Sequence, residues 1–408
     1  MKNKYRDLYQ ALLDHLSRKE FAIITGARQT GKTTLLEQLK EFCDKKKQEN
    51  YLLSAEDPVI LKALNEHPEN LFQFIPKLKN KRVVLFLDEI QYLRNPSNFL
   101  KLLYDKYVGN LKVYATGSSA FYIDKKFKDS LAGRKRLFRL HTLNFDEFLK
   151  FKTGNNNLSK ELEIICSDKN YISLERRTIE NYFSEFLIFG GYPAVVLADT
   201  NNDKILLLKE LWQSYLKRDV VDSRIQNEDK FFSLLKILAH QSGSLLNLNE
   251  LANTLQVSIT LIENYIYVLR KSFHISLIRP FHGNIRKELT KMPKIYFNDL
   301  GFRNIILNSF NAVEERIDKG EIVENYIFRR LSDFHDTDDI KFWRTTSGNE
   351  IDFIISTSFN EGFAIESKFN AITYKETKYN KFINSYPGYP LSVRAYISES
   401  NEENILGL

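Results

Sequence analysis

The chain has few of the residues that stabilise small secreted proteins or zinc-bound proteins. Among its 408 residues are two cysteines, Cys43 and Cys166, which lie far apart and fit no metal or redox spacing. Its seven histidines are scattered without the spacing of a zinc site. This composition predicts a reduced, cytoplasmic protein without a structural zinc ion.

A long uninterrupted apolar run is also missing. The first residues, Met1 to Asp7, are polar and charged and lack the apolar core of a signal peptide. The longest apolar stretch, residues 187–198, is short and is interrupted by two glycines and a proline. The sequence therefore predicts no membrane passage.

The length and charge set the remaining bounds. A chain of 408 residues is too long for one ordinary core, and its 43% hydrophobic content is enough to bury two or three. We expect three parts, a P-loop core at 1–151, a helical and winged-helix middle at 152–311, and an α/β end at 312–408. The net charge of +7 permits a nucleic-acid partner without proving one.

What the chain does contain is a complete phosphate-binding loop. Residues 26–33 read Gly-Ala-Arg-Gln-Thr-Gly-Lys-Thr and follow the apolar run Phe21 to Ile24, which predicts a buried strand. Glycines let the backbone curl so that successive N–H groups face phosphate oxygens, and the following helix adds the positive end of its dipole. The alternative is a strand-to-helix turn without a ligand, but strand, loop and helix all lie where nucleotide binding requires them.

Each polar residue of this loop has an expected role. Lys32 is expected to reach the β- and γ-phosphates, and the hydroxyl of Thr33 is expected to coordinate Mg²⁺. The predicted cofactors are therefore ATP and Mg²⁺. The predicted nucleotide contacts are Gly26, Arg28, Gln29, Thr30, Gly31, Lys32, Thr33 and Thr34.

A second element of the same chemistry follows downstream. Val83 to Leu87 is an apolar run without polar interruption, typical of a central parallel strand, and it ends in Asp88 and Glu89. This is the pattern of a Walker B strand. Asp88 is expected to hold the Mg²⁺ shell, and Glu89 is expected to be the base that activates water. The alternative is an acidic strand end solvated at the rim of the sheet.

The neighbouring strands complete a predicted sheet. Residues 111–116 form a strand expected to lie between the two Walker strands, and Thr116 or Ser118 at its end is the candidate sensor of the γ-phosphate. Residues 51–54 are expected beside the Walker B strand, and residues 137–140 form the fifth strand. Strands alternating with helices predict an α/β fold with a doubly wound parallel sheet and the ligand at the carboxyl ends of its strands.

Arg134 follows a glycine just before the fifth strand. An arginine in this place can complete the active site of a neighbouring subunit as an arginine finger, which would make the protein a homo-oligomer. The alternative is an arginine solvated on a basic surface with Lys135 and Arg136.

The middle of the chain predicts a winged helix. Residues 231–238, 248–255 and 259–269 repeat apolar positions at helical spacing, with Asn247 or Asn249 as a helix cap. Residues 275–278 and 294–297 are expected to pair as the wing. The basic residues of the wing predict phosphate contacts with duplex DNA, and they are Arg279, Arg286, Lys287, Lys291 and Lys294. The presumed recognition helix has few basic residues, so a winged helix used for protein contact remains the alternative.

The last third contains a group of acidic residues on predicted strands. Asp352 lies on one predicted strand, and Glu366 and Lys368 lie on the next with side chains on the same face. Two carboxylates and a lysine in this arrangement can hold Mg²⁺ and activate water for phosphodiester cleavage. Because acidic residues are common near strand ends, a solvated, inactive group is the alternative.

Together these segments resemble one family, the prokaryotic AAA+-like P-loop ATPases that carry a carboxy-terminal domain of unknown function, with a winged helix and a restriction-endonuclease-like PD-(D/E)xK fold. The motifs that carry the resemblance are Gly26 to Thr33, Leu87 to Gln91, Thr116 to Ser119, Leu131 to Arg134, Leu143 to Phe148, Gly190 to Pro193, Pro293 to Asp299, Glu350 to Phe353, and Glu366 to Lys368. The resemblance implies catalytic roles for Lys32 and Glu89, a role in trans for Arg134, and nuclease-like positions at Glu324, Asp352, Glu366 and Lys368.

These observations predict a cytoplasmic Mg²⁺-dependent ATPase linked to nucleic-acid binding or processing. The competing prediction is a signalling switch in which ATP gates an unidentified protein partner. In that case the winged helix and a catalytically inactive nuclease-like domain serve as interaction modules.

Overall fold

The computed structural model describes residues 4–78, 82–118, 131, 133–168, 170–223, 225–282, 288, 291–398, 400 and 403–407. The chain divides into two compact units, one of residues 1–142 with 271–273 and one of residues 143–270 with 274–408. Within the described ranges, no helix is both long enough and apolar enough to span a membrane.

The first unit contains a five-stranded parallel sheet in the order β2-β3-β4-β1-β5. The predicted parallel α/β sheet is therefore confirmed, with β4 between the two Walker strands and β2 beside the Walker B strand. Its strands are β1 (Phe21–Thr25), β2 (Asn50–Ser54), β3 (Val83–Asp88), β4 (Leu111–Gly117) and β5 (Lys135–Arg139).

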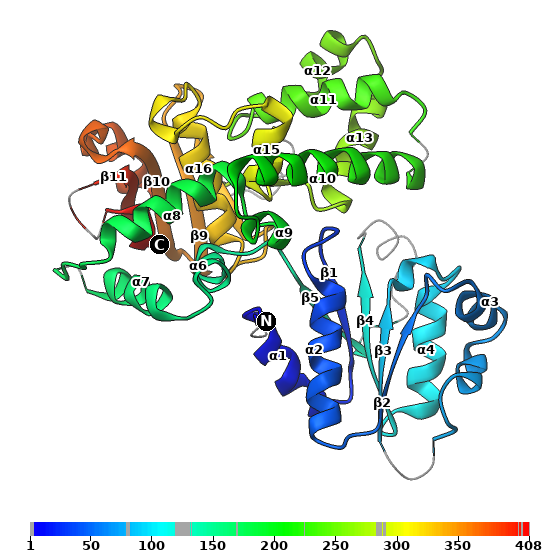
Figure 1. Cartoon of the computed structure of the whole chain (residues 1–408). Coiled ribbons are helices and arrows are strands. Elements are labelled where there is room, and N and C mark those ends of the chain that lie inside the picture. Colours follow the sequence, from blue (N-terminus) through cyan, green and yellow to red (C-terminus); the bar gives the residue numbers. More distant parts are fainter. Residues whose placement is uncertain are drawn as a thin grey trace. The chain divides into compact units, whose positions relative to one another are not determined.

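Helices cover both faces of this sheet because alternate strand residues point to opposite sides (Figure 1). Ile24 and Phe86 pack with α1 and α2 in one apolar cluster. Ile23 and Leu85 pack with α3 and α4 in another. These helices are α1 (Leu8–Asp14), α2 (Lys32–Lys45), α3 (Pro58–Glu66) and α4 (Pro96–Tyr107).

The second unit begins with helices whose ends are set by polar caps. Asn144 and Glu147 form a reciprocal capping box at the start of α6. Asn227 caps α11, and Asn247 caps α12, which confirms one of the two predicted caps. The helices of this region are α6 (Phe145–Thr153), α7 (Asn157–Ser167), α8 (Arg176–Phe189), α9 (Pro193–Val196), α10 (Asn201–Asp222), α11 (Glu228–His240), α12 (Leu248–Leu255) and α13 (Ile259–Lys271).

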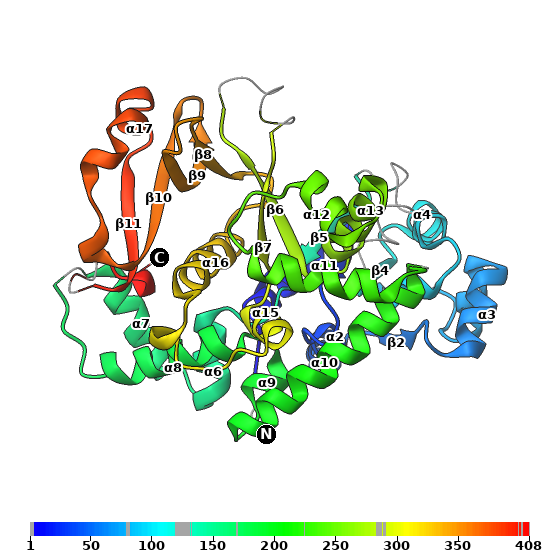
Figure 2. The same ribbon diagram turned by 90° about the horizontal axis from the view of Figure 1, so that it is seen from above.

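A six-stranded mixed sheet in the order β11-β10-β9-β8-β6-β7 completes the second unit (Figure 2). The strands are β6 (Ile275–Pro280), β7 (Lys294–Phe297), β8 (Ile340–Arg344), β9 (Glu350–Ser358), β10 (Glu361–Asn370) and β11 (Leu391–Ile397). The associated helices are α15 (Leu300–Leu307), α16 (Lys319–Leu331) and α17 (Asn380–Ser385). Strands β6 and β7 pair as an antiparallel hairpin, and β6 also pairs in parallel with β8. The predicted hairpin is thus one end of a larger sheet.

The glycine pair after α8 is explained by close backbone packing. The amide of Gly191 donates to the carboxylate of Asp299 at 2.8 Å, and Gly190 adopts a φ of +73° beside the same carboxylate. A Cβ atom on Gly301 would lie 2.0 Å from the carbonyl oxygen of Phe189. The end of α8 and the start of α15 therefore approach more closely than larger residues allow.

Candidate functional site

The phosphate-binding loop lies between the carboxyl end of β1 and the start of α2, as nucleotide binding requires. Gly31 adopts a φ of +93° at the N-cap of α2. A Cβ atom on Gly26 would lie 2.0 Å from the carbonyl oxygen of Leu140. The glycines therefore provide a tight turn at one position and a close backbone approach at the other.

The side chain of Lys32 is turned into this loop. It is 5% exposed, and its Nζ donates to the carbonyl oxygens of Gly26 at 3.0 Å and Ala27 at 2.7 Å. Burial lowers the pKa of Lys32 to about 8, an effect that the charge of Glu89 opposes. Phosphate oxygens would offer this ammonium charged acceptors in place of neutral carbonyl groups.

The remaining loop residues divide into a buried set and an exposed set. Thr30 is fully buried, and its hydroxyl donates to the carbonyl of Ala27 at 2.9 Å. The guanidinium of Arg6 donates to the carbonyl of Thr30 at 2.8 Å, a brace from outside the motif that the sequence pattern did not predict. Arg28 is half-buried, whereas Gln29 and Thr34 are exposed.

The residues predicted to hold Mg²⁺ lie together. The hydroxyl of Thr33 donates to one carboxylate oxygen of Asp88 at 2.7 Å, and the hydroxyl of Thr116 donates to the other. Hydroxyl and carboxylate oxygens are the ligands that Mg²⁺ prefers. The pair formed by Thr33 and Asp88 thus fits the predicted ion.

Glu89 is held by contacts from two directions. Its backbone has a φ of +55°, and its amide donates to the hydroxyl oxygen of Thr116 at 3.0 Å. Its carboxylate accepts a hydrogen bond from the hydroxyl of Ser118 at 3.1 Å and another from the side-chain amide of Gln91. Gln91 and Ser118 also bond to each other, because the Gln91 amide donates to the Ser118 hydroxyl at 2.9 Å.

This network adds a residue to the predicted site and locates two others. Gln91 is 7% exposed and lies two residues after the predicted base, so its place in the acidic motif was the available signal. The hydroxyls of Thr116 and Ser118 contact Asp88 and Glu89. Their predicted role as sensors of the γ-phosphate stays a prediction.

Arg134 lies at the start of strand β1, and the phosphate-binding loop lies at its end. Its carbonyl accepts a hydrogen bond from the amide of Phe21, the first residue of β1, whereas the loop follows the last residue of that strand. A strand of five residues is about 17 Å long. The guanidinium pairs with Asp105 at 2.7 Å. Arg134 is therefore too far from Lys32 of its own chain to act there, and its role in trans stays a prediction.

The hairpin predicted as a wing is only partly basic on its surface. Arg279 and Lys291 are exposed, and Arg286 and Lys287 lie outside the described residues. Lys294 is 1% exposed, so its predicted contact with DNA phosphate is wrong. Its side chain points into the second unit, where its ammonium contacts the carboxylates of α16 and β9.

The acidic residues of the second unit form two neighbouring groups. In the first group, Nζ of Lys294 lies 2.8 Å from Oε1 of Glu324, 2.5 Å from Oε1 of Glu350 and 3.5 Å from Oδ1 of Asp352. Burial raises the pKa of Glu324 to about 7, with a further contribution from Asp352.

In the second group, Glu366 accepts hydrogen bonds from Lys368 and from the hydroxyl of Tyr379. Burial, followed by the charge of Asp352, raises the pKa of Glu366 to about 7. The second oxygen of Asp352 accepts from the amide and the hydroxyl of Ser367, at 2.9 Å and 2.7 Å.

These groups do not fit a divalent ion as arranged. An ion bound to Glu324 and Asp352 would need the space that the ammonium of Lys294 fills. Within the ranges that the structure describes, no three His, Cys, Asp or Glu side chains are placed to hold a metal ion. The predicted ligands Asp352 and Glu366 lie on neighbouring strands, and each is already bonded to a separate set of donors.

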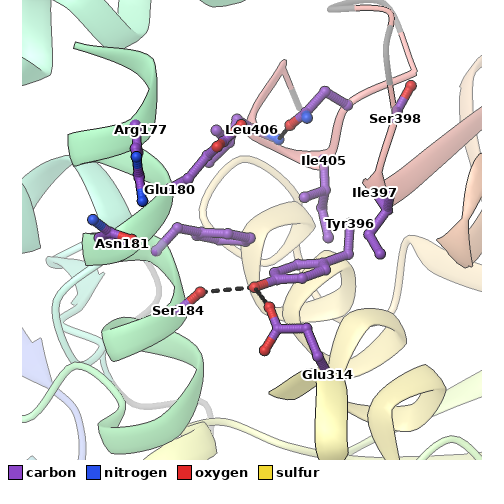
Figure 3. Close-up of a pocket in the computed structure, with 12 residues that line it drawn as sticks. Arg177, Glu180, Asn181, Ser184, Glu314, Tyr396, Ile397, Ser398, Ile405 and Leu406 are labelled. Atoms are coloured by element: carbon purple, nitrogen blue, oxygen red, sulfur yellow. Dashed lines mark hydrogen bonds between the residues drawn. The ribbon is translucent and has the colours of Figure 1, made fainter. Parts of the chain in front are cut away.

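A separate pocket of about 340 Å³ lies between α8 and the end of the chain (Figure 3). The hydroxyl of Tyr396 donates to Glu314 at 2.6 Å and bonds to Ser184 at 2.7 Å. Burial raises the pKa of Tyr396. These bonds join the walls of the pocket, and its lining includes none of the residues predicted for catalysis or metal binding.

Comparison with protein families matches three segments of the chain. Residues 18–149 match an AAA domain, residues 180–312 match a domain of unknown function (DUF8612), and residues 319–405 match a domain of unknown function (DUF4143). The uncharacterized protein MJ1544 of Methanocaldococcus jannaschii is 30% identical over 82% of this chain and 71% of its own length. The chain belongs to this family of AAA-domain proteins.

Two more distant matches accompany this one. The uncharacterized protein MJ1637 of the same organism is 27% identical over 86% of this chain and 75% of its own length. Among solved structures, the replication initiator DnaA bound to AMPPCP and single-stranded DNA is 16% identical, over 65% of this chain and 86% of that chain, with a TM-score of 0.33. The family membership and the parallel sheet together establish an AAA-type P-loop NTPase fold.

Proposed function

We propose that this AAA-family protein binds ATP with Mg²⁺ and hydrolyses it. The observation that carries the proposal is the hydrogen-bond network joining the loop to the acidic end of β3. In it, Thr33 bonds to Asp88, and Gln91 and Ser118 bond to Glu89. A loop that only turned a strand into a helix would not need this convergence of hydroxyls and carboxylates.

Each side chain has a distinct task in this proposal. Lys32 and the amide groups at the start of α2 bind the phosphates. Thr33 and Asp88 hold the Mg²⁺ ion, which neutralises charge on the phosphates when bound. Glu89 accepts a proton from the attacking water as the water oxygen bonds to the γ-phosphorus. The bond between that phosphorus and the β,γ-bridging oxygen breaks, and ADP and phosphate leave.

The test separates binding from hydrolysis. Lys32→Ala is expected to lose ATP binding, measured by isothermal titration, because the phosphates lose their buried cation. Glu89→Gln is expected to bind ATP normally while its turnover falls by roughly 10²- to 10⁴-fold, because it cannot accept the proton. Lys45→Ala is the control, since Lys45 lies on the same helix and pairs with Glu41 at the surface. Equal turnover in wild type and Glu89→Gln would refute the proposal.

We propose as the coupled activity that the protein binds duplex DNA through the basic surface of its middle segment. The net charge of +7 and the exposed Arg279 and Lys291 support this. Fluorescence anisotropy of the full chain with a labelled duplex should show affinity that falls steeply with salt, because the contacts are to phosphate. The double variant Arg279→Ala/Lys291→Ala should bind all sequences more weakly, whereas Lys45→Ala should not.

The competing function is an ATP-gated switch acting on a protein partner. The burial of Lys294 among carboxylates supports it, because this lysine is removed from any DNA surface and the acidic group is not open to a metal ion. Absence of duplex-DNA binding even at low salt would favour the switch. A homo-oligomer with Arg134 acting in trans is compatible with either function.

A further inference from the structure

We propose that the ammonium of Lys294 is the resident cation of the acidic group in the second unit. In this proposal, Lys294 occupies the place that a divalent metal would need, and the group joins β7, β9 and α16 instead of binding an ion. The carboxylates come from Glu324, Glu350 and Asp352.

The geometry leaves the ammonium and a metal ion competing for one position. Nζ lies within 2.5 to 3.5 Å of an oxygen atom of each of the three carboxylates. Divalent ions bind oxygen at about 2.0–2.6 Å, so an ion among the same oxygens would overlap Nζ. The two cations exclude each other.

The lysine is also fixed at its backbone end. Residue 294 pairs with Ile278 in the hairpin, and the carbonyl of the preceding Pro293 accepts from the amide of Leu246 at 2.8 Å. The side chain passes the ring of Phe342, with Nζ 5.6 Å from the ring centre. The backbone pairing fixes where the lysine side chain starts, and the contact with Phe342 lies along its path to the carboxylates.

The other donors around the group are already engaged. Tyr296 donates its hydroxyl to Glu324, and Arg344 donates to Glu350 at 3.0 Å. Asp352 accepts two hydrogen bonds from Ser367. Lys294 and Arg344 supply two positive charges to the three carboxylates, and the neutral donors hydrogen-bond to them, so a metal ion would have to displace some of these partners.

The surroundings of Glu324 leave little room for an alternative arrangement. Gly243, with a φ of +82°, lies against this carboxylate, and a Cβ atom added there would be 3.1 Å from its Oε2. The amide of Gly243 donates to the carbonyl of Ile295 at 2.7 Å, next to Lys294 on β7. The loop before α12 thus packs directly against the Glu324 carboxylate and β7.

The test asks whether removing the ammonium creates a metal site. Lys294→Met keeps the apolar stem and removes the charge, and Lys381→Met is the matched control because Lys381 is an exposed lysine of the same unit. Binding of Mn²⁺ to the full chain without nucleotide is measured by electron paramagnetic resonance. Wild type and Lys381→Met are expected to give equal binding. Lys294→Met is expected to bind one additional ion, because its carboxylates can then close on the position that the ammonium filled.

A second substitution assigns the additional ion to this group. In the double variant Lys294→Met/Asp352→Asn, the added binding is expected to disappear, while Asp352→Asn alone is expected to bind Mn²⁺ like wild type. The phosphate-binding loop is the same in all these proteins, so its contribution cancels, and the test is independent of the proposed ATPase activity.

Two results would overturn the proposal. One is loss of Mn²⁺ binding in Asp352→Asn relative to wild type, which would show that the group binds metal with Lys294 in place. The other is a folded Lys294→Met, verified by circular dichroism, that binds no additional ion. If Lys294→Met does not fold, the comparison of wild type with Asp352→Asn still decides the question.

Discussion

The hydroxyl of Ser118 donates a 3.1 Å hydrogen bond to the carboxylate of Glu89. Ser118 follows the end of β4, and Glu89 follows the end of β3. The bond therefore joins two neighbouring strands at the carboxyl end of the sheet, where the phosphate-binding loop lies. Gln91 bonds to both residues and closes the group. The side-chain amide of Gln91 donates to Glu89 and Ser118, both of which lie outside the phosphate-binding loop. The orientation of the proposed base therefore depends on a residue beyond that loop.

Gln91→Ala is expected to lower kcat for ATP on the order of 10- to 100-fold, because a base displaced by about 1 Å no longer aligns the water. The KM for ATP should stay within about twofold of wild type, since the phosphate contacts are unchanged. Steady-state kinetics measures both constants. Gln10→Ala is the control, as Gln10 is exposed. A rise in KM at constant kcat would show that Gln91 serves nucleotide binding instead.

Arg134→Ala is expected to reduce ATP turnover by roughly 10³-fold if the arginine completes a neighbouring site. Arg136→Ala is the matched control, because Arg136 is an exposed arginine two residues later, on β5. Mixing Arg134→Ala with Lys32→Ala should restore part of the activity, since each chain supplies what the other lacks. Unchanged turnover in Arg134→Ala would leave the arginine with its surface pair to Asp105.

Gly301→Ala is expected to destabilise the second unit by about 1–3 kcal/mol, because its Cβ atom would lie 2.0 Å from the carbonyl oxygen of Phe189. Gly320→Ala is the opposite case, since a Cβ atom there meets nothing within 4 Å on helix α16. It should be neutral or more stable by up to about 1 kcal/mol. Urea unfolding followed by tryptophan fluorescence reports on this unit, because Trp212 and Trp343 both belong to it. Equal effects of the two substitutions would contradict the packing argument.

Asp318→Asn is expected to destabilise the same unit by about 3 kcal/mol near neutral pH. Burial alone would raise the pKa of Asp318, but hydrogen bonds and charge from Arg316 and Arg303 outweigh burial and lower the pKa to about 2. A lowered carboxyl pKa stabilises the fold above the unfolded value of about 3.9, and this stability is lost as pH falls toward 2.

The measurement compares the free energy of unfolding of wild type and Asp318→Asn at pH 6, 4 and 3. The difference between the two proteins should shrink slightly between pH 6 and 4 and much more between pH 4 and 3. Glu315→Gln controls for the loss of an acid at an exposed site three residues earlier. A difference that grows on acidification would show that the pair with Arg303 does not hold the charge of Asp318.

The sequence allowed prediction of the nucleotide site because its chemistry is contiguous. The loop from Gly26 to Thr33 and the acidic end of β3 are each continuous in the chain, and parallel pairing brings their ends to one edge. Arg6 could not be predicted, because its acceptor Thr30 lies 24 residues away and no pattern links the two.

Lys294 shows the opposite limit. A lysine near the polar segment 282–293 is typical of a solvated strand end, and only contacts 30 and 58 residues further along the chain bury it. Asp352 and Glu366 were predicted from their alternation on strands, but alternation gives the face of a sheet and not the cation that lies on that face. The cation is Lys294, on a strand well separated in sequence from the carboxylates, so only the fold shows that it lies among them.

The parallel pairing of β6 with β8 affects any attempt to study the carboxy-terminal segment alone. A fragment covering the matched residues 319–405 would keep β8 to β11 and lose β6 and β7. The uncovered edge of β8 would offer its backbone groups to other copies and promote aggregation. The same cut would remove Lys294 from its carboxylates, so a metal ion bound by such a fragment would reflect the excision and not the intact protein.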